Sequence, residues 1–517
     1  MRMSYNNTLH WSICVPSTCT STDVQKFLSK LFNSIITYKK ADVQVSSLNC
    51  YTDKYVPFDT SEIVYCSVIA LFSSFVLVAT IYDIVYRKLG TRVGTEEKLC
   101  HKIIISFSSI ENVKKLLKYT PSSDTNLEFV FGIKVISMIL IIGSHTLLFV
   151  VGGPVFNEDF YIESVTKPEN AFLLNNPLFV DTFLLISGFL MSRLLLLELN
   201  KKAGNVNIFM LYVARYIRLT PAYAVMIGLY ATILKRLGNG PLWNNKILIE
   251  YNRCVQSWWT NILYINNYVN DDNICMFQSW YLSVDTHLFL IAPLIIYPLW
   301  RWPRVGKVLL SLFTFTFGLI PFVITYRYKL DPTQMAYPSE ILDIAKNYYF
   351  RFAYIKTHMR SLSYSIGLVM GYVVDQLQSS KTQLSKTLTY TSLTVCVTFG
   401  ISAVYSITIF YLPNYTYDEL ESALYASLHK IAWSLCVGCI IVLCATNNLG
   451  TLKSFLSWPP FVPFSRLTYC AYLVNGVIEL YSLGTLRSPT YLSIWSLVCT
   501  STSFTIFTNL FFSYLLR

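Results

Sequence analysis

Charged residues are scarce in this sequence: they occupy only 14% of its 517 positions, whereas hydrophobic residues occupy 53%. A soluble globular chain carries roughly 25% charged residues, so a single soluble core does not fit this balance. Several catalytic signatures are also missing. The sequence has no Walker loop, no Gly-X-Ser-X-Gly elbow, no His-Glu-X-X-His and no paired Cys-X-X-Cys framework. We therefore expect neither a P-loop nucleotide site nor a bound metal.

The net charge of +12 does not indicate a nucleic-acid partner. Lys and Arg are scattered at the ends of apolar segments and form no basic face. Positive charge in such flanking positions is typical of membrane proteins, where it sets the orientation of the spans. We expect membrane lipid, and no nucleic acid, as the surroundings of the chain.

Apolar stretches of about twenty residues, the length that crosses a bilayer, recur through most of the sequence. They predict an all-α, polytopic membrane helix bundle of about eleven spans. The expected spans cover residues 63–86, 130–151, 178–199, 219–234, 280–300, 308–326, 361–374, 388–411, 431–445, 467–483 and 492–516.

The charges flanking the first span predict the orientation of the chain. That span ends in Arg87 and Lys88 and leads into a basic stretch, so residues 61–128 are interpreted as a first span with a cytosolic linker. The N-terminus would then lie outside the cytosol and, with eleven spans, the C-terminus inside it. Asn414, in an Asn-X-Thr acceptor, and the pair Cys254 and Cys275 would face outward, as potential glycosylation and disulfide sites.

Residues 1–60 are polar and are predicted to form a small extracytoplasmic domain. They contain Cys14, Cys19 and Cys50, and Asn6 begins a second Asn-X-Thr acceptor. Three cysteines cannot all pair with one another, so one is free or its partner lies in an upstream segment. We favour an N-terminally incomplete sequence.

The expected second span contains two ionisable residues, Lys134 and His145. Buried ionisable groups in spans are costly and usually serve a function. Their separation of eleven positions puts them on one helix face about 16 Å apart. Imidazole can take and return a proton near neutral pH, so His145 is the candidate general base. The alternative is a structural histidine that only forms hydrogen bonds.

Asp181 lies near the outer end of the third expected span, at a depth similar to that of His145. A carboxylate there could orient the imidazole and stabilise its protonated form. It could equally be a helix N-terminal carboxylate stabilised by the helix dipole.

Other polar residues are candidates for substrate binding. Arg215 and Arg218 lie three positions apart near the expected cytosolic end of the fourth span, where they could clamp phosphate groups or simply anchor the helix. Asp285 is intramembrane and is taken as a third catalytic candidate. The remaining substrate-binding candidates come from two outward-facing segments and are Trp280, Tyr281, Lys356 and Arg360.

These segments, in this order, resemble the acyltransferase-3 family over residues 129–517. Lys134 and His145 have the spacing of that family's Arg and His, Val180-Asp181-Thr182-Phe183 is similar to its second conserved segment, and the 215–221 and 280–285 stretches resemble its third and fourth. The cysteine-containing start resembles the domain preceding the transferase in the nose-resistant-to-fluoxetine branch of animals. Lys134 stands where the family usually has Arg, and Asn475 where animal relatives often have His.

The resemblance implies O-acyl transfer from acyl-coenzyme A, or from an acyl lipid, to a hydroxyl of a lipid or carbohydrate acceptor. Acyl-coenzyme A would be a co-substrate, with no tightly bound cofactor. Lys134, Arg215 and Arg218 would bind the donor phosphates from the cytosol, and Asp181 would hold His145. Because positions 134 and 475 depart from the family pattern, the alternative function is a transporter of lipids or hydrophobic compounds on a catalytically inactive acyltransferase scaffold. A receptor using the extracytoplasmic segment is a third interpretation.

Overall fold

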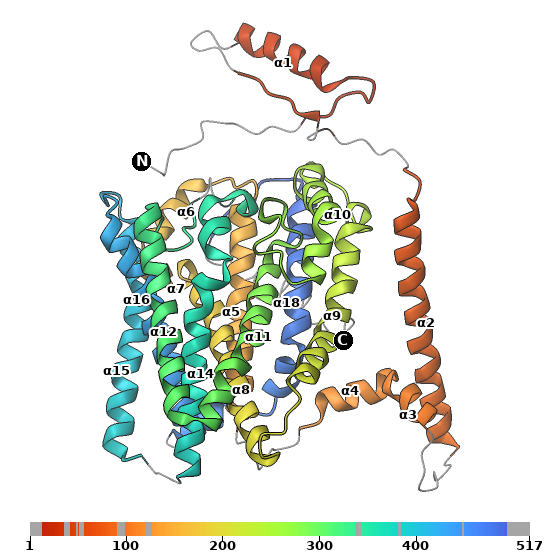
Figure 1. Cartoon of the computed structure of the whole chain (residues 1–517). Helices are drawn as coiled ribbons and strands as arrows, with labels where there is room; N and C mark the ends of the chain where they lie inside the picture. The colour runs from red at the N-terminus through yellow and green to blue at the C-terminus, as the bar shows by residue number, and fades with distance from the viewer. Residues whose placement is uncertain are drawn as a thin grey trace.

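The computed structural model describes residues 13–35, 42–47, 50, 56–89, 99–119, 127–337, 341, 343–380, 384–446 and 449–493. Their regular structure is helical, apart from an isolated bridge between Val155 and Thr490. Long helices run side by side in a bundle, and α2 stands at its edge (Figure 1).

Ten described helices have twenty or more residues, and each overlaps one of the first ten expected spans. They are α2 (Thr60–Lys88), α5 (Phe129–Val151), α8 (Pro177–Lys201), α9 (Ile208–Ala231), α11 (Trp280–Arg301), α12 (Pro303–Tyr328), α14 (Thr357–Ser379), α15 (Lys386–Tyr405), α16 (Glu419–Ala445) and α18 (Phe461–Gly484).

Seven of these helices are long and apolar enough to cross a membrane: α2, α5, α8, α11, α12, α15 and α16. The chain is therefore a multi-pass membrane protein. Helices α9, α14 and α18 have 24, 23 and 24 residues but fall outside this apolar set. The expected last span, 492–516, lies almost entirely outside the described residues. The structure thus supports seven candidate spans and does not establish the count of eleven.

Shorter helices connect or flank the long ones. They are α1 (Ser21–Ile35), α3 (Leu99–Ser106), α4 (Ser109–Leu117), α6 (Glu158–Val165), α7 (Ala171–Leu174), α10 (Ile249–Ile262) and α17 (Gly450–Leu456). In Figure 1, α6 and α10 lie at one end of the bundle and α4 lies at the other. We call these the α10 end and the α4 end.

Helices α8 and α14 pack closely because each presents a glycine to the other. A Cβ atom on Gly188 would lie 2.2 Å from the Tyr364 carbonyl oxygen, and one on Gly367 would lie 2.2 Å from the Leu185 carbonyl oxygen. Small residues allow such close approach between membrane helices. The Ser-Gly-Phe-Leu segment of α8 therefore sets the position of α14, and with it the position of Arg360.

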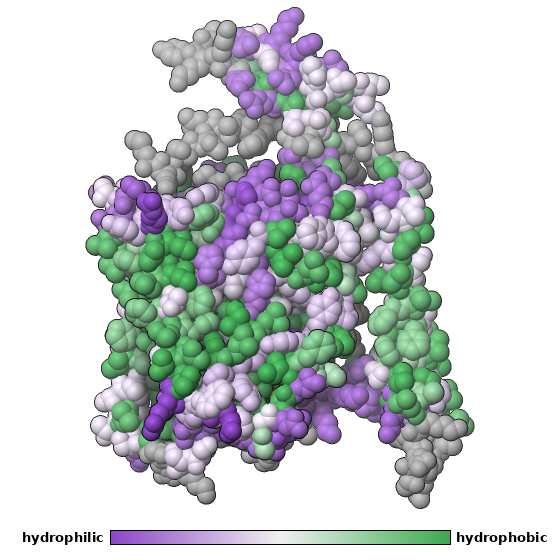
Figure 2. Space-filling view, viewed as in Figure 1, coloured by the Kyte–Doolittle hydropathy of each residue, from purple (hydrophilic) through white to green (hydrophobic). Residues whose placement is uncertain are grey.

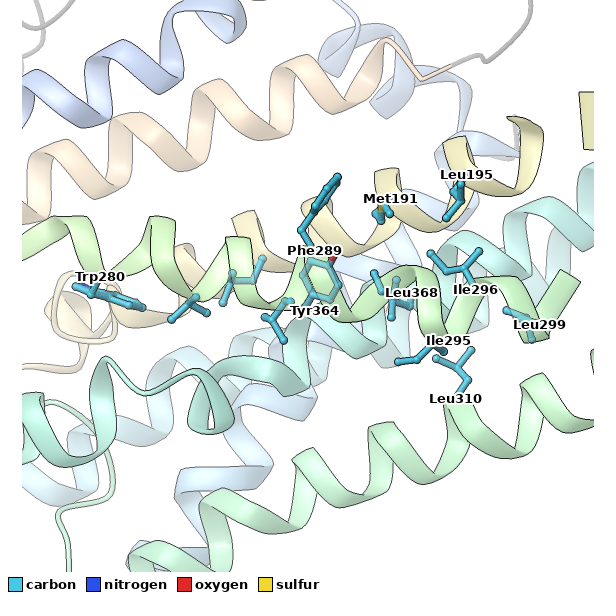
Figure 3. Close-up of a cluster of buried hydrophobic side chains, with 14 of the residues drawn as sticks. Met191, Leu195, Trp280, Phe289, Ile295, Ile296, Leu299, Leu310, Tyr364 and Leu368 are labelled. Atoms are coloured by element: carbon cyan, nitrogen blue, oxygen red, sulfur yellow. The ribbon is translucent and has the colours of Figure 1, made fainter. Parts of the chain in front are cut away.

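An apolar core continues from this contact towards α11 and α12. Figure 3 shows side chains from α8, α11, α12 and α14 interleaved there, including Met191, Phe289, Ile296, Leu310 and Leu368. This packing fixes α11, which carries Trp280, Tyr281 and Asp285.

The outer surface of the bundle matches a membrane environment. Figure 2 shows hydrophobic side chains gathered in a broad middle zone, with hydrophilic side chains concentrated towards the two ends. A zone of this kind is what lipid contact requires.

Helix α2 is joined to the bundle by polar contacts near its two ends. Near the α10 end, the buried Glu62 carboxylate accepts a hydrogen bond from Arg236 Nε at 2.7 Å and lies 3.2 Å from Lys235 Nζ. At the α4 end, Arg87 bridges Asp83 and Glu111. Arg466 of α18 then caps α4 by donating to three of its terminal carbonyl groups.

The N-terminal cysteines do not form the disulfide that the sequence left open. Cys14, Cys19 and Cys50 are all exposed and free. The described part of residues 1–60 contains one helix, α1, and its cysteines lie outside that helix. A compact cysteine-linked domain is therefore not established, and Asn6 lies outside the described residues.

Candidate functional site

A cavity of about 270 Å³ lies among α5, α8, α9, α11, α18 and the loop that follows α12. Six residues singled out in the sequence line it: Lys134, His145, Arg215, Trp280, Tyr281 and Asp285. Arg218, Asp181, Lys356 and Arg360 are not part of this lining. The cavity combines ionisable groups with apolar walls, the usual make-up of a ligand site.

His145 has a defined hydrogen-bond partner. Its Nδ1 atom lies 2.8 Å from Oδ1 of Asn475 in α18. The Phe277 ring packs edge-on against the imidazole, with ring centroids 5.9 Å apart. The imidazole is thus held by one amide and one aromatic ring.

Asn475 is itself held by a buried carboxyl group. Its Nδ2 atom donates to Glu479 Oε1 at 3.3 Å, and the Thr146 hydroxyl donates to the same oxygen at 2.7 Å. Because the amide nitrogen points to Glu479, the amide oxygen faces His145. A carbonyl oxygen can only accept, so the geometry assigns the His145 proton to Nδ1 and leaves Nε2 as the basic atom.

The pairing expected between Asp181 and His145 is not formed. Asp181 Oδ2 instead accepts a hydrogen bond from Arg360 Nη1 at 3.1 Å, and both side chains are buried. The Arg360 guanidinium also stacks on the rings of Tyr354 and Trp280. The close α8–α14 contact explains this difference, because it brings Arg360 beside Asp181. Arg360 therefore supports two residues of the cavity wall, Trp280 and Tyr354, without lining the cavity itself.

Arg215 and Asp285 form an ion pair inside the cavity. The Ser187 hydroxyl donates to the other oxygen of Asp285 at 2.6 Å, and the Arg215 guanidinium lies 4.1 Å from the centre of the Phe289 ring. Arg215 is thus already engaged by a carboxylate, which reduces its capacity to clamp phosphate together with Arg218. Arg218 is exposed, and Lys134 lies within electrostatic reach of both Arg218 and Asp285.

Lys356 is occupied in a network at the α10 end of the bundle. Its ammonium group donates to Asp271 Oδ2 at 2.7 Å, and Arg351 donates to the other oxygen of Asp271 at 2.9 Å. Burial alone would raise the pKa of Asp271, but these hydrogen bonds outweigh burial and hold that pKa below its usual value. The contacts indicate a structural role for Lys356.

The expected disulfide between Cys254 and Cys275 is present. It joins α10 to the segment that leads into α11. Asn261 of α10 reinforces the link by donating to the Cys275 carbonyl at 2.9 Å and to Ser279 Oγ at 3.1 Å. These bonds fix the segment that places Phe277 and Trp280 at the cavity. Asn414 is exposed in the loop before α16, which leaves it accessible as a modification site.

Sequence reasoning missed Glu479 and saw Asn475 only as a departure from a family pattern. A signal was present, because Glu479 is an ionisable residue within an expected span and lies one helical turn after Asn475. Their link to His145 spans 330 positions and required the fold.

The family model of an acyltransferase domain, acyltransferase 3, matches residues 127–516. The chain belongs to the acyltransferase-3 family. The match covers every residue of the cavity.

Two curated relatives come from Caenorhabditis elegans. The chain is 27% identical over 514 residues to "Nose resistant to fluoxetine protein 6", covering 92% of this chain and 61% of that protein. It is 24% identical over 329 residues to "Regulator of hypoxia-inducible factor 1", covering 59% of this chain and 60% of that protein. The chain thus spans about three fifths of the length of each relative. No solved structure matches it.

Proposed function

We propose that this acyltransferase-3 protein transfers an acyl group from acyl-coenzyme A to the hydroxyl group of an acceptor, with His145 as general base. The observation that carries the proposal is the 2.8 Å contact between His145 and Asn475 beside a cavity that also contains Lys134 and Arg215. An oriented imidazole beside cationic groups is an arrangement suited to acyl transfer.

In the proposed reaction, His145 Nε2 takes the proton of the acceptor hydroxyl while the hydroxyl oxygen attacks the thioester carbonyl. The new ester bond forms and the carbon–sulfur bond breaks. The leaving thiolate takes the proton back from the imidazolium, so that one ester and one free coenzyme A are released. Asn475 keeps the proton on Nδ1 throughout.

The donor would enter from the α4 end of the bundle, which we propose faces the cytosol. Lys134 and the exposed Arg218 would contact its phosphates, since both are cations without a carboxylate at hydrogen-bond distance among the described residues. Arg215, held by Asp285, would shape the passage between this end and His145. The proposal thus gives Arg215 and Asp285 a positioning role.

Release of free coenzyme A by purified protein in lipid nanodiscs tests the proposal. We expect His145→Ala to lower acceptor-dependent release by at least about 100-fold, the typical contribution of general base catalysis. His287→Ala is the matched control, because His287 also lies in a long helix but does not line the cavity. It should retain activity.

Equal release by His145→Ala and wild type would refute the assignment of the base. If folded wild-type protein releases no coenzyme A with any donor or acceptor extract, acyl transfer itself is refuted. Retained movement of a lipid across the bilayer in that case would establish the transporter interpretation.

A further inference from the structure

The cavity has two chemically different ends. Its lining Lys, Arg, His and Asp side chains are Lys134, His145, Arg215 and Asp285. At the α10 end the cavity is lined by α6, α7, the start of α8 and the loop after α12, and its lining there contains no charged side chain. We call this part the distal end and define it by Tyr161, Leu174, Asn176, Gln334, Met335 and Ile341.

Most of the distal end is apolar. Tyr161, Leu174, Met335 and Ile341 belong to one buried hydrophobic cluster, which also includes Val151 at the end of α5. A charged group entering this region would lose its hydration without gaining an ion partner, which is strongly unfavourable. The distal end therefore disfavours phosphorylated, sulfated or amine-bearing ligands.

Two residues of the distal end, Asn176 and Gln334, each have a buried side-chain oxygen, Asn176 Oδ1 and Gln334 Oε1, without a hydrogen bond to any described residue. Gln334 uses only its nitrogen, which donates to the Met335 carbonyl at 3.3 Å. The Tyr161 hydroxyl is already donated to the Ala336 carbonyl at 2.6 Å. Leaving a buried acceptor unsatisfied is unfavourable, so a ligand in the cavity that supplies a donor would be stabilised when either amide rotates its oxygen towards it.

We infer that the distal end binds the acceptor of the transfer reaction, and that this acceptor is an uncharged alcohol with a largely apolar body. The inference rests on the proposed function, which requires a hydroxyl at His145. Apolar walls would bury the body of the alcohol. Beyond the hydroxyl that reacts at His145, the free amide oxygens can accept from one or two further hydroxyl donors of the alcohol, whereas a free sugar would bring more hydroxyl groups than this wall can pair.

The first test compares matched acceptors with wild-type protein in nanodiscs. The probes are 1-hexadecanol with its charged counterpart 16-hydroxyhexadecanoate, 1-palmitoylglycerol with its charged counterpart 1-palmitoylglycerol 3-phosphate, and glucose. Each of them keeps a free hydroxyl group and is supplied with labelled acyl-coenzyme A. We expect at least one neutral alcohol to bind and to form labelled ester, and its charged counterpart to do so at least about tenfold less well. Equal or better use of the charged compounds, or of glucose, would overturn the inference.

The second test changes the amide oxygens. Asn176→Leu and Gln334→Leu should each raise the KM for 1-palmitoylglycerol, which has a second hydroxyl, about five- to tenfold, more than they change the KM for acyl-coenzyme A. Gln376→Leu removes an exposed side-chain amide outside the cavity and serves as the matched control. If the variants instead alter the preference for acyl-chain length, the distal end holds the donor chain and the inference is wrong.

Binding of radiolabelled 1-palmitoylglycerol, measured without donor, separates this inference from the proposed function. Saturable binding that is weakened by Asn176→Leu supports the distal site even where no ester forms, and then only the transferase proposal fails. Ester formation on charged or sugar acceptors, with no binding of neutral alcohols, supports the transferase and refutes the acceptor class.

Discussion

The Nδ1 atom of His145 lies 2.8 Å from Oδ1 of Asn475, although 330 positions separate the two residues in the chain. Helices α5 and α18 pack against each other, and this brings the pair together. Asn475 is in turn held by Glu479, which also accepts a hydrogen bond from Thr146 beside His145. The residue that departs from the pattern of animal relatives is thus the hydrogen-bond partner of the candidate base.

Replacing Asn475 with Leu should lower kcat for acyl transfer about 10- to 100-fold, the usual cost of losing a partner that orients a functional imidazole. The KM for acyl-coenzyme A should change little, because Asn475 does not line the cavity. Single-turnover release of coenzyme A measures the effect. The pH at which kcat is half-maximal should also move, since the amide would no longer fix the tautomer.

Asn475→His provides the matched control, because a second imidazole can still accept from Nδ1 of His145. We expect it to restore much of the rate that Asn475→Leu loses. A leucine variant with unchanged kcat and unchanged pH profile would show that Asn475 has only a packing role.

Much of the fold follows from the sequence because lipid imposes a simple rule. Apolar runs of about twenty residues must form helices there, so the long helices fall where the runs are, as at α5 and α12. For helices with more polar residues, the sequence predicts spans that are too short at both ends. For example, the span expected over 361–374 is helix α14, Thr357–Ser379, in the structure. The ends of such helices are stabilised by contacts such as Asn267 with Thr357, which hydropathy does not register.

The site was less predictable because depth in the membrane does not identify neighbours. Asp181 and His145 have similar expected depths, yet Asp181 faces α14, where the paired glycines Gly188 and Gly367 bring Arg360 within reach. Likewise, Arg215 and Arg218 are adjacent on one helix face, but only Arg215 meets Asp285. Which carboxylate meets which cation is decided by helix packing.

The buried pair of Asp181 and Arg360 makes a prediction about stability. Asp181→Ala should destabilise the protein by about 3–5 kcal/mol, because it leaves the Arg360 charge buried without its partner. Thermal unfolding in detergent measures this loss. The double variant Asp181→Leu with Arg360→Met removes both charges and should recover much of the stability.

Activity per folded molecule distinguishes this structural role from a catalytic one. We expect the double variant to retain acyl transfer, although with altered substrate affinity, since Arg360 supports Trp280 and Tyr354 at the cavity wall. If the double variant folds well but transfers no acyl group, Asp181 has a catalytic role.

The Cys254–Cys275 disulfide predicts both a stability and an orientation. It closes a loop with a sequence separation of 21, and for a loop of this length the chain-entropy model gives about 3 kcal/mol of stabilisation. Cys254→Ser together with Cys275→Ser should therefore lower the unfolding temperature.

Disulfides persist in oxidising compartments, so the α10 end should face the lumen or the outside. Cys100, which is exposed and free in α3, serves as the matched probe for the α4 end. With a membrane-impermeant maleimide, Cys100 should be labelled only once the cytosol is opened. The exposed, free Cys50, whose carbonyl accepts a hydrogen bond from Asn244 just before α10, should be labelled from the opposite side. The reverse pattern would invert the proposed topology and place the Lys134 end of the cavity away from cytosolic acyl-coenzyme A.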